Sequence, residues 1–345
     1  MSYVKHRDRL LSTYFGTSDF FSFNLKPLGW QAEDLIVNDE ELQRKWAKEN
    51  GAVVKEGRLI SRFKSLPYVN KLFGRPQWIQ QIVVAQVKRY KPDIVYCQNL
   101  SVLDPATLTK IKGLCRLLVG QIACPKPPNE YLKKYDLIVS SFPHYVKEFK
   151  QMGLESEYQK LAFESRILNK IGKQKRIYDV TFIGSFTPDH SEGTKVLEEV
   201  AKKIPVHVWG QGLEYLSPNS SLRKNYHGEA WGLGMYKILA QSKIVINRHI
   251  SVSSNYANNM RLYEATGIGA MLITDKKINL KDLFNIGTEI EEYKDSKDLS
   301  DKIKYFLEND IERIKIAKAG QLRTLKDHNY PVRMKELNQL ILKYL

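Results

Sequence analysis

The sequence has few cysteines and no long hydrophobic run. Its three cysteines, Cys97, Cys115 and Cys124, form no CxxC pair, so we expect buried, reduced thiols and neither a zinc site nor a redox site. No segment approaches the roughly 18 consecutive apolar residues that a membrane-spanning helix needs. The opening residues MSYVKHRDRLL also lack the apolar region of a signal peptide. We therefore expect a cytoplasmic protein.

Two motifs that bind phosphates or cofactors are absent as well. There is no Walker A pattern, GxxxxGK[ST], which argues against a P-loop phosphotransferase. Gly210 and Gly212 follow an expected strand, but Tyr215 occupies the third glycine position of a GxGxxG fingerprint. Gly267 and Gly269 follow an expected helix, where the fingerprint needs a strand. We therefore do not expect an enzyme that transfers hydride with a bound dinucleotide.

Acidic residues are outnumbered by basic ones. The chain has 54 Lys and Arg against 38 Asp and Glu, a formal net charge of +16, which favours anionic partners. The basic residues form no long run, and aromatic residues do not alternate with them as in RNA-binding strips, so we expect no specific nucleic-acid partner. Two interpretations stay open, a lysine-rich solvated surface and peripheral contact with the anionic inner surface of the membrane.

The length and the order of the expected elements indicate an α/β protein with two domains. The chain has 345 residues, more than one domain usually contains, and strands alternate with helices in both halves, as in parallel sheets with right-handed crossovers. The expected strands are 94–97, 117–122, 137–140, 180–184, 206–210, 243–247 and a run that ends at Asp275. The expected helices are 38–51 with Asn38 as its cap, 77–89, 144–152, 192–203, 232–241, 299–307, 311–325 and one that begins near Tyr330. The charged, less regular stretch 154–178 separates domains at 1–165 and 178–328, and 329–345 forms a final helix.

The segment 243–275 carries the strongest functional signal. Asn258, Asn259 and Arg261 stand at the start of a short helix, and Glu264 follows one turn later. Cationic and amide donors at a helix N-terminus suit a phosphate, because the N–H groups there and the helix dipole favour an anion. A single carboxylate can also accept hydrogen bonds from the vicinal hydroxyls of a ribose. The segment therefore predicts a nucleotide site, and a nucleotide-sugar is the expected ligand.

The residues of this segment also have simpler explanations. No DxD motif is present, so we expect no metal site, and Arg261 is the leading candidate to neutralise a diphosphate because its planar fork can bind phosphate through two hydrogen bonds. The alternative for Arg261 is an ion pair with Glu264 three residues later on the same helix face. The alternative for Glu264 is an exposed helical side chain.

Further candidates lie where expected strands end, which is where functional residues of α/β sheets gather. Gly184 permits a ligand to approach the backbone closely, with a plain turn as the alternative. His249 could donate a hydrogen bond to a diphosphate or make a structural one, and the same choice stays open for His190 and His227. Other residues at strand ends are Ser185, Gly210, Asn247, Gln98, Asn99 and His144.

The same residues carry a family resemblance. The motif NNMRLYEATG at 258–267, followed by an apolar strand and a Thr-Asp pair, resembles the CgeB-like glycosyltransferases, a part of the group-1 glycosyltransferases of the GT-B fold. The resemblance covers about 178–330 and includes VTFIGS, WGQG, YHG and INRHIS, while the first half is similar in pattern only. It implies two Rossmann-like domains that face each other across a cleft, with the donor bound by the second and the acceptor facing the first. It also implies a C-terminal helix that crosses back to the first domain.

The resemblance implies roles for single residues. Glu264 matches the residue that binds the donor ribose, and Arg261 and Asn259 match positions near the diphosphate. Gly184 matches a turn that a ligand approaches closely. Tyr256 stands where many retaining members have a second Glu, so the stereochemical outcome stays open. Tyr226, His227 and Gly228 match positions at which the chain of related enzymes runs beside the nucleotide base.

We therefore predict a metal-independent glycosyltransferase of the hexosyltransferase type. It would move a sugar from a UDP- or GDP-sugar, without a further cofactor, to a hydroxyl of a glycan, lipid or protein in cell-surface glycan synthesis. Arg261 and His249 are the catalytic candidates, and Asp104 and His144 are weaker candidates for a general base. The substrate-binding candidates are Gly184, Ser185, His190, Gly210, Tyr226, His227, Gly228, Asn247, Asn258, Asn259 and Glu264. The alternative is a non-catalytic protein of the same fold in cell-surface or spore-coat assembly.

Overall fold

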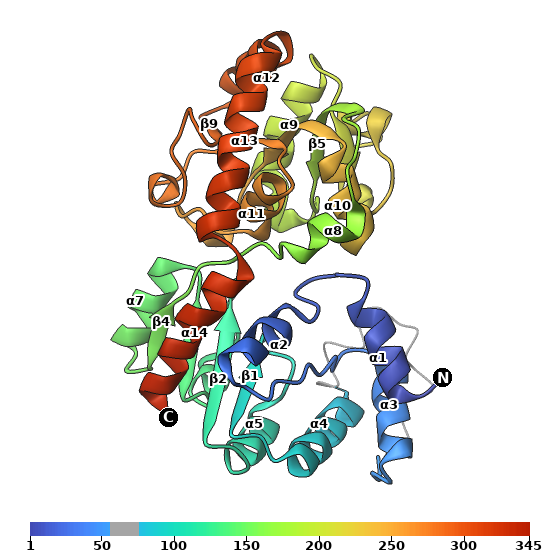
Figure 1. The fold of residues 1–345 in the computed structure, drawn as a ribbon, viewed down its shortest axis with the longest axis vertical. Coiled ribbons are helices and arrows are strands. Elements are labelled where there is room, and N and C mark those ends of the chain that lie inside the picture. The colour runs from blue at the N-terminus through green and yellow to red at the C-terminus, as the bar shows by residue number, and fades with distance from the viewer. Residues whose placement is uncertain (56–75) are drawn as a thin grey trace. The chain divides into compact units, whose positions relative to one another are not determined.

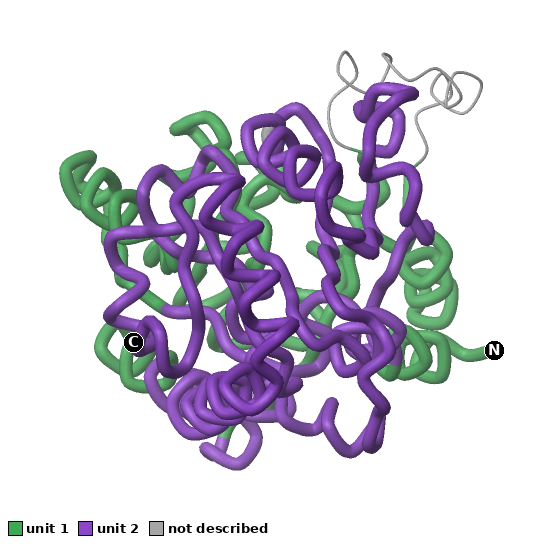
Figure 2. The backbone as a smooth tube through the Cα atoms, turned by 90° about the horizontal axis from the view of Figure 1, so that it is seen from above, with its two compact units in different colours: residues 1–12, 30–159, 337–345 green, residues 13–29, 160–336 purple. Residues whose placement is uncertain are grey.

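The structure is a computed structural model that describes residues 1–55 and 76–345. Contacts divide the chain into two compact units, which Figure 2 shows in different colours. Unit 1 consists of Met1–Ser12, Trp30–Gln159 and Leu337–Leu345, and unit 2 consists of Thr13–Gly29 and Lys160–Glu336. The sequence predicts an unbroken first domain over 1–165, whereas these contacts group residues 13–29 with the second unit.

Unit 1 contains a parallel sheet of four strands in the order β1-β2-β3-β4 (Figure 1). The strands are β1 (Ile94–Cys97), β2 (Leu117–Ile122), β3 (Leu137–Ser140) and β4 (Ser156–Tyr158). The helices that precede or connect them are α4 (Gln77–Tyr90), α5 (Pro105–Lys112), α6 (Asn129–Leu132) and α7 (Pro143–Gln151). Nearly every residue of β2 and β3 is buried, which explains their continuous apolar sequences.

Two more helices of unit 1, α1 (Tyr3–Leu11) and α3 (Glu40–Glu49), pack with α4 around a small apolar core that contains Trp46. The predicted cap of α3, Asn38, is wrong by one residue. Asp39 directly precedes the first helical residue, and its carboxylate accepts a hydrogen bond from the Leu42 N–H at 2.7 Å. An acceptor at this position satisfies an N–H group that has no partner within the helix.

Unit 2 contains a parallel sheet of five strands in the order β6-β5-β7-β8-β9. The strands are β5 (Tyr178–Ile183), β6 (His207–Trp209), β7 (Ser242–Asn247), β8 (Met271–Asp275) and β9 (Glu291–Tyr293). The helices are α2 (Phe20–Leu25), α8 (Arg166–Ile171), α9 (Ser191–Ala201), α10 (Gly232–Ala240), α11 (Met260–Gly267), α12 (Ser296–Glu308) and α13 (Asp310–Asp327). The last helix, α14 (Tyr330–Tyr344), begins in unit 2 and ends in unit 1, where Tyr344 donates a hydrogen bond to Glu157 at 2.9 Å.

The core of unit 2 lies on its three central strands. Side chains of β5, β7 and β8, among them Phe182, Ile246 and Ile273, pack with apolar residues of α9, α12 and α13. Two parallel-sheet domains of the Rossmann-like type, as the sequence predicts, are therefore confirmed. The short elements α2, β4, α8 and β9 were not predicted.

Residues 13–29 are tied to unit 2 by polar contacts. The Arg166 guanidinium donates to both carboxylate oxygens of Asp19, at 3.0 and 2.8 Å, and lies 3.5 Å from the ring centre of Phe23. The Asn24 amide donates to the buried carboxylate of Glu164 at 2.8 Å. This segment is therefore an integral part of the second unit.

The three cysteines are free thiols, as predicted, but they are not all buried. Cys97 and Cys115 are partly exposed, and Cys124 is exposed. Cys124 lies in the loop that follows β2, outside the covered part of the sheet, so the expectation of burial was wrong for this residue. None of the helices in the described ranges has the length and apolar character that crossing a bilayer requires.

Candidate active site

The strand order of unit 2 defines where a ligand would bind. After β6 the chain returns to the opposite side of β5 and forms β7, so the direction in which strands are added reverses between β5 and β7. The loops that leave the carboxyl ends of two such strands run apart and open a crevice, the usual ligand site of α/β sheets. The predicted residues that directly follow or end these strands are Gly184, Ser185, Asn247 and His249.

Two asparagines hold the start of α11 beside this crevice. The side chains of Asn247 and Asn259 exchange hydrogen bonds of 3.2 and 2.8 Å, and Asn247 also donates to Thr274 on β8 at 3.0 Å. Asn259 is the cap of α11, because its side-chain oxygen accepts from the Leu262 N–H at 3.2 Å. These side chains are therefore engaged in fixing the N-terminus of α11 against β7 and β8.

Asn258 differs from its neighbour. It is almost completely buried, and its amide nitrogen has no hydrogen-bond partner among the described residues. A buried donor without a partner costs about 1–3 kcal/mol, so such groups usually mark a place where a water or a ligand binds. Asn258 directly precedes the cap of α11, the helix end at which the dipole favours an anion.

His249 is paired with an acid that the sequence analysis did not select. Its ring Nδ1 lies 2.6 Å from a carboxylate oxygen of Asp275, which also accepts from the His249 backbone N–H at 3.1 Å. Burial raises the pKa of the Asp275 carboxyl, but the His249 ring and the Lys277 ammonium outweigh this effect and hold that pKa below its usual value. A charged carboxylate at Nδ1 places the proton there. The opposite ring nitrogen, Nε2, is buried and has no partner in the described part of the chain.

Arg261 and Glu264 bind each other in this structure. One Arg261 amino group lies 2.8 Å from a carboxylate oxygen of Glu264, and the second oxygen accepts from the Tyr236 hydroxyl at 3.2 Å. Both side chains are largely covered, with 14% of Arg261 and 7% of Glu264 exposed, so the pair is more buried than a surface ion pair. The same guanidinium contacts the Met235 sulfur at 3.2 Å, and its Nε has no partner among the described residues.

The glycine turns after β5 and β6 contact each other. Gly210 has a φ of 153°, and a Cβ atom there would lie 1.7 Å from the Gly184 carbonyl oxygen. Only glycine fits such a backbone and such a contact. Gly210 therefore lets the two turns meet, and this packing role is the one that the structure supports for it. Ser185, next to Gly184, is partly exposed.

Arg248 is a second residue that the sequence analysis passed over. It donates to the His190 carbonyl at 2.7 Å and thereby links the loop after β7 to the loop after β5. A Cβ atom on Gly193 would lie 1.7 Å from the Arg248 guanidinium carbon, so a glycine in the first turn of α9 makes room for it. Burial lowers the pKa of this guanidinium. The feature of the sequence that could have indicated Arg248 is its position directly after the strand β7.

The predicted residue His190 makes a local contact, because its ring Nδ1 lies 2.7 Å from the Thr187 hydroxyl.

Residues 226–228 lie beside the end of β6. The Tyr226 hydroxyl donates to the Gly210 carbonyl at 2.8 Å, and the Gly210 N–H donates to the Gly228 carbonyl at 2.9 Å. The exposed His227 ring stacks on Trp209, with ring centres 4.5 Å apart and planes at 22°. Trp209 is buried, so His227 is the exposed member of this stack, and its Nε2 lies 2.9 Å from His207 Nδ1.

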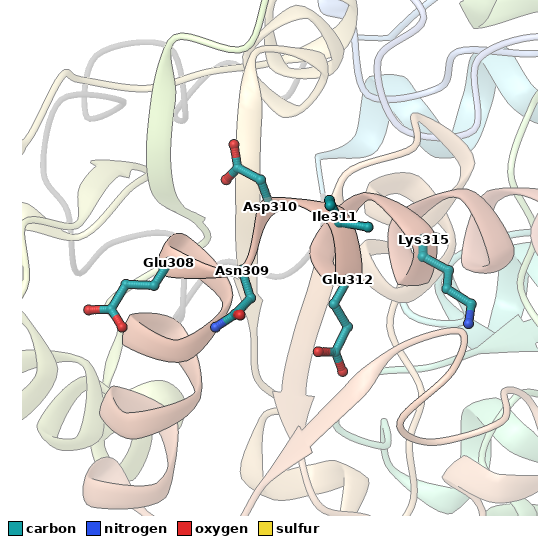
Figure 3. Close-up of a pocket in the computed structure, with 6 residues that line it drawn as sticks. All are labelled: Glu308, Asn309, Asp310, Ile311, Glu312 and Lys315. Atoms are coloured by element: carbon teal, nitrogen blue, oxygen red, sulfur yellow. The ribbon is translucent and has the colours of Figure 1, made fainter.

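Other parts of the described structure do not add to this site. A hollow of about 540 Å³ lies where α12 meets α13, and no predicted site residue lines it (Figure 3). Among residues 1–55 and 76–345, no group of three or more His, Cys, Asp or Glu side chains is placed to hold a metal ion. In unit 1, the Asp104 carboxylate accepts from the Thr107 N–H at 2.7 Å and caps α5, and the His144 ring packs against Tyr145 with ring centres 4.7 Å apart.

Comparisons with known proteins agree with this architecture. Residues 193–339 match a family model described as glycosyl transferase-like. No curated protein matches the chain. A glycosyltransferase from Rickettsia africae ESF-5 is 15% identical, with 95% of this chain and 93% of that chain covered and a TM-score of 0.60.

Two further solved structures are similar at the same level. HepE from Anabaena, in complex with UDP and glucose, is 12% identical, covers 77% of this chain and 81% of its own, and has a TM-score of 0.59. Sucrose-phosphate synthase from Thermosynechococcus elongatus is 9% identical, covers 77% of each chain and has a TM-score of 0.56. The protein therefore has the GT-B fold, and the glycosyl transferase-like match over residues 193–339 supports a glycosyltransferase.

Proposed function

We propose that the protein transfers a sugar from a nucleoside diphosphate sugar, with UDP as the first candidate nucleotide, to a hydroxyl of a glycan, lipid or protein acceptor. The observation that carries this proposal is a pair of buried groups beside α11, the Asn258 amide nitrogen and His249 Nε2, that have no partner within residues 1–55 and 76–345. Both lie in loops at the carboxyl ends of the sheet that lead to a helix N-terminus, where a diphosphate would find N–H donors and a favourable dipole. A UDP complex of one structural neighbour supports the choice of nucleotide.

His249 would stabilise the charge that develops on the leaving diphosphate. The Asp275 carboxylate binds the ring through Nδ1, so Nε2 is the ring nitrogen that would meet a phosphate oxygen. Asn258 and the first N–H groups of α11 would share this charge. Fixed donors in a site from which water is excluded are the usual way in which a leaving group of this kind is stabilised.

Glu264 would bind the donor ribose, and Arg261 would bind the diphosphate. The two side chains now hold each other, so we infer that the nucleotide replaces this ion pair: ribose hydroxyls take the place of the guanidinium on Glu264, and the guanidinium turns to phosphate. The Tyr236 hydroxyl keeps the Glu264 carboxylate in position during this exchange. The exposed His227 ring, which stacks on the buried Trp209, is the candidate platform for the base.

The finer family assignment rests on the same residues. The motif at 258–267 and the YHG turn at 226–228 favour a CgeB-like enzyme, which acts without a metal because arginine, histidine and amide donors serve the diphosphate. The runner-up function is a non-catalytic protein of the same fold in cell-surface or spore-coat assembly. It is favoured by the closed Arg261–Glu264 pair, in which the two groups satisfy each other.

Titration calorimetry with UDP, GDP, TDP and ADP tests the proposal. We expect one of them, UDP first, to bind, and we expect Asn258→Ala to weaken that binding by about tenfold, roughly 1.4 kcal/mol, as for the loss of a hydrogen bond to a charged group. Asn219→Ala is the matched control, because this asparagine is exposed in a different loop of the same unit. Failure of all four nucleotides to bind would favour the non-catalytic function.

Turnover with the nucleotide-sugar that binds separates an enzyme from a binding protein. Product formation followed by mass spectrometry should fall more than tenfold in kcat/KM for Arg261→Ala, because the guanidinium acts on charge that grows in the transition state. Arg116→Ala, an exposed arginine of unit 1, serves as the control. Unchanged turnover in Arg261→Ala would remove this residue from the mechanism.

A further inference from the structure

The outer face of α13 exposes large apolar side chains. Ile311, Ile314 and Leu322 are 88, 59 and 61% exposed, and none of them belongs to the core of unit 2. At 3.6 residues per turn, their positions fall within a narrow stripe along one side of the helix. Several branched aliphatic residues that gather on one exposed helix face are typical of an interaction surface.

Three lysines share this stripe. Lys315, Lys318 and Lys326 are exposed, and with the three apolar residues they span an arc of about 120° around the helix axis. In the part of the chain that the structure describes, none of the three lysines forms an ion pair. We call the six residues Ile311, Ile314, Lys315, Lys318, Leu322 and Lys326 the α13 stripe.

The opposite side of α13 anchors the helix firmly. Ile316 and Ala317 belong to the core, and the Thr324 hydroxyl lies 2.6 Å from the Thr266 hydroxyl on α11. A Cβ atom on Gly320 would lie 2.3 Å from the Glu289 carbonyl oxygen, so the helix approaches the neighbouring backbone closely. The α13 stripe is therefore held in place before any partner binds.

The acidic residues near the stripe lie at one end of it, Glu308 at the end of α12 and Asp310 and Glu312 in the first turn of α13. Asp310 pairs with Arg313 at 2.5 Å, and Glu312 accepts from the Tyr305 hydroxyl at 2.6 Å. Both line the hollow at the α12–α13 junction together with Ile311, as Figure 3 shows. The rest of the stripe carries positive charge only.

The charge pattern favours one kind of occupant. Two copies of α13 packed antiparallel about the middle of the stripe would place Lys318 against its own equivalent, and like charges in close contact are unfavourable. A lipid surface avoids this conflict, because lysine stems can lie along the apolar layer while their ammonium groups reach phosphate headgroups. The net charge of +16 adds a long-range attraction to the same surface.

We propose that the α13 stripe docks unit 2 on an anionic phospholipid bilayer, with α13 parallel to the membrane plane. Ile311, Ile314 and Leu322 enter the boundary between headgroups and acyl chains, and the lysines contact lipid phosphates. This contact does not depend on the proposed transferase activity. It assigns a membrane-facing side to a chain of which no described helix is able to span a bilayer.

Vesicle cosedimentation tests the proposal. The full chain should bind vesicles of phosphatidylglycerol and phosphatidylcholine, and should not bind vesicles of phosphatidylcholine alone. Replacing Lys315, Lys318 and Lys326 by Gln should weaken binding roughly fivefold for each lysine, since a lysine at an anionic surface is worth about 1 kcal/mol. The triple variant Ile311→Ser, Ile314→Ser, Leu322→Ser should lose binding while its melting temperature stays close to that of the native chain.

Matched variants keep the test specific. Ile278→Ser removes an exposed isoleucine elsewhere in unit 2, and Lys294→Gln with Lys304→Gln removes exposed lysines outside the stripe; these variants should bind as the native chain does. The proposal is overturned if the native chain does not bind anionic vesicles, or if the apolar triple variant binds them equally well. It is also overturned if the stripe variants abolish a concentration-dependent dimer and leave vesicle binding intact, because the occupant is then a second copy.

Discussion

At the scale of single residues, the candidate site depends on groups whose partners lie on other elements. His249 is in hydrogen-bond contact with Asp275 at the end of β8, and Arg261 bonds to Glu264 under the Tyr236 hydroxyl of α10. Each of these contacts decides which atom remains available to a ligand. His249 presents Nε2 because its other nitrogen faces a carboxylate, and Arg261 and Glu264 satisfy each other in an ion pair.

The Asp275 carboxylate should stabilise unit 2 at neutral pH. Its pKa is lower in the folded protein than in the unfolded chain, so its contribution is present above the unfolded pKa and is lost as the pH falls through the folded pKa. We expect Asp275→Asn to lower the free energy of unfolding by about 1–3 kcal/mol near pH 7, and by progressively less below about pH 4.

Scanning calorimetry over this pH range measures the effect. Asp301→Asn on α12 is the control, because Asp301 also has a lowered pKa but lies exposed beside Lys297, where an ion pair contributes little. A difference between Asp275→Asn and the native chain that stays constant down to low pH would contradict the assignment of a charged carboxylate at this position.

At the scale of elements, the N-terminus of α11 is held by its cap and by the strands beneath it. Asn259 caps α11 as Asp39 caps α3: in each case the side chain accepts from the backbone N–H three residues later, from Leu262 and from Leu42. The two caps therefore offer a comparison in which the local helix chemistry is matched and only the proposed ligand site differs.

We expect Asn259→Ala and Asp39→Ala each to destabilise the protein by about 1 kcal/mol, the usual result of losing a cap. Only Asn259→Ala should also weaken nucleotide binding, by roughly tenfold or more, because the N–H groups of α11 then lose their fixed direction. Thermal unfolding and calorimetry with the nucleotide measure the two effects. Equal nucleotide affinities of the two variants would show that the N-terminus of α11 does not take part in nucleotide binding.

The elements that could be predicted from sequence are those with an apolar run of their own. β5, β7 and β8 have the continuous apolar sequence of buried strands because both faces of the sheet are covered, and the candidate site residues follow their ends. β9, with the sequence EEY, has no such run and was missed. β4, with the sequence SEY, was missed for the same reason.

The part of the site that escaped prediction lies in contacts between elements. Nothing in the local sequence distinguishes Asp275 from any polar residue after a strand, because its importance comes from the ring of His249, 26 positions earlier. Arg248 needs Gly193 on α9 to make room for its guanidinium. Such pairings depend on how the elements pack, so they can be recognised only when the positions of both residues in the folded structure are known.

At the scale of the whole molecule, unit 2 is assembled from two separate stretches of chain. Residues 13–29 are joined to the rest of unit 2 through Arg166, which binds Asp19 through two parallel hydrogen bonds and lies over Phe23. Arginine suits this place because its planar fork matches a carboxylate and its flat face covers an aromatic ring.

We expect Arg166→Lys to loosen residues 13–29, because a lysine retains the charge and loses both the paired hydrogen bonds and the stacked face. Limited proteolysis with chymotrypsin should then cut after Phe23, the ring that the guanidinium covers, several times faster than in the native chain. Lys112→Arg, a conservative exchange at an exposed lysine of unit 1, is the control. An unchanged rate at Phe23 would mean that other contacts hold the segment.

The route of the chain restricts how this protein can be recombined with others. The polypeptide passes from one unit to the other after residues 12, 29, 159 and 336, so neither unit corresponds to one continuous stretch of gene. In a chimaera joined at a single point near residue 160, residues 13–29 would come from this protein and the rest of unit 2 from another protein. The side chains of residues 13–29 would then lack the residues that they contact here. Exchange of specificity by recombination should therefore succeed only when residues 13–29 are taken from the same parent protein as the rest of unit 2.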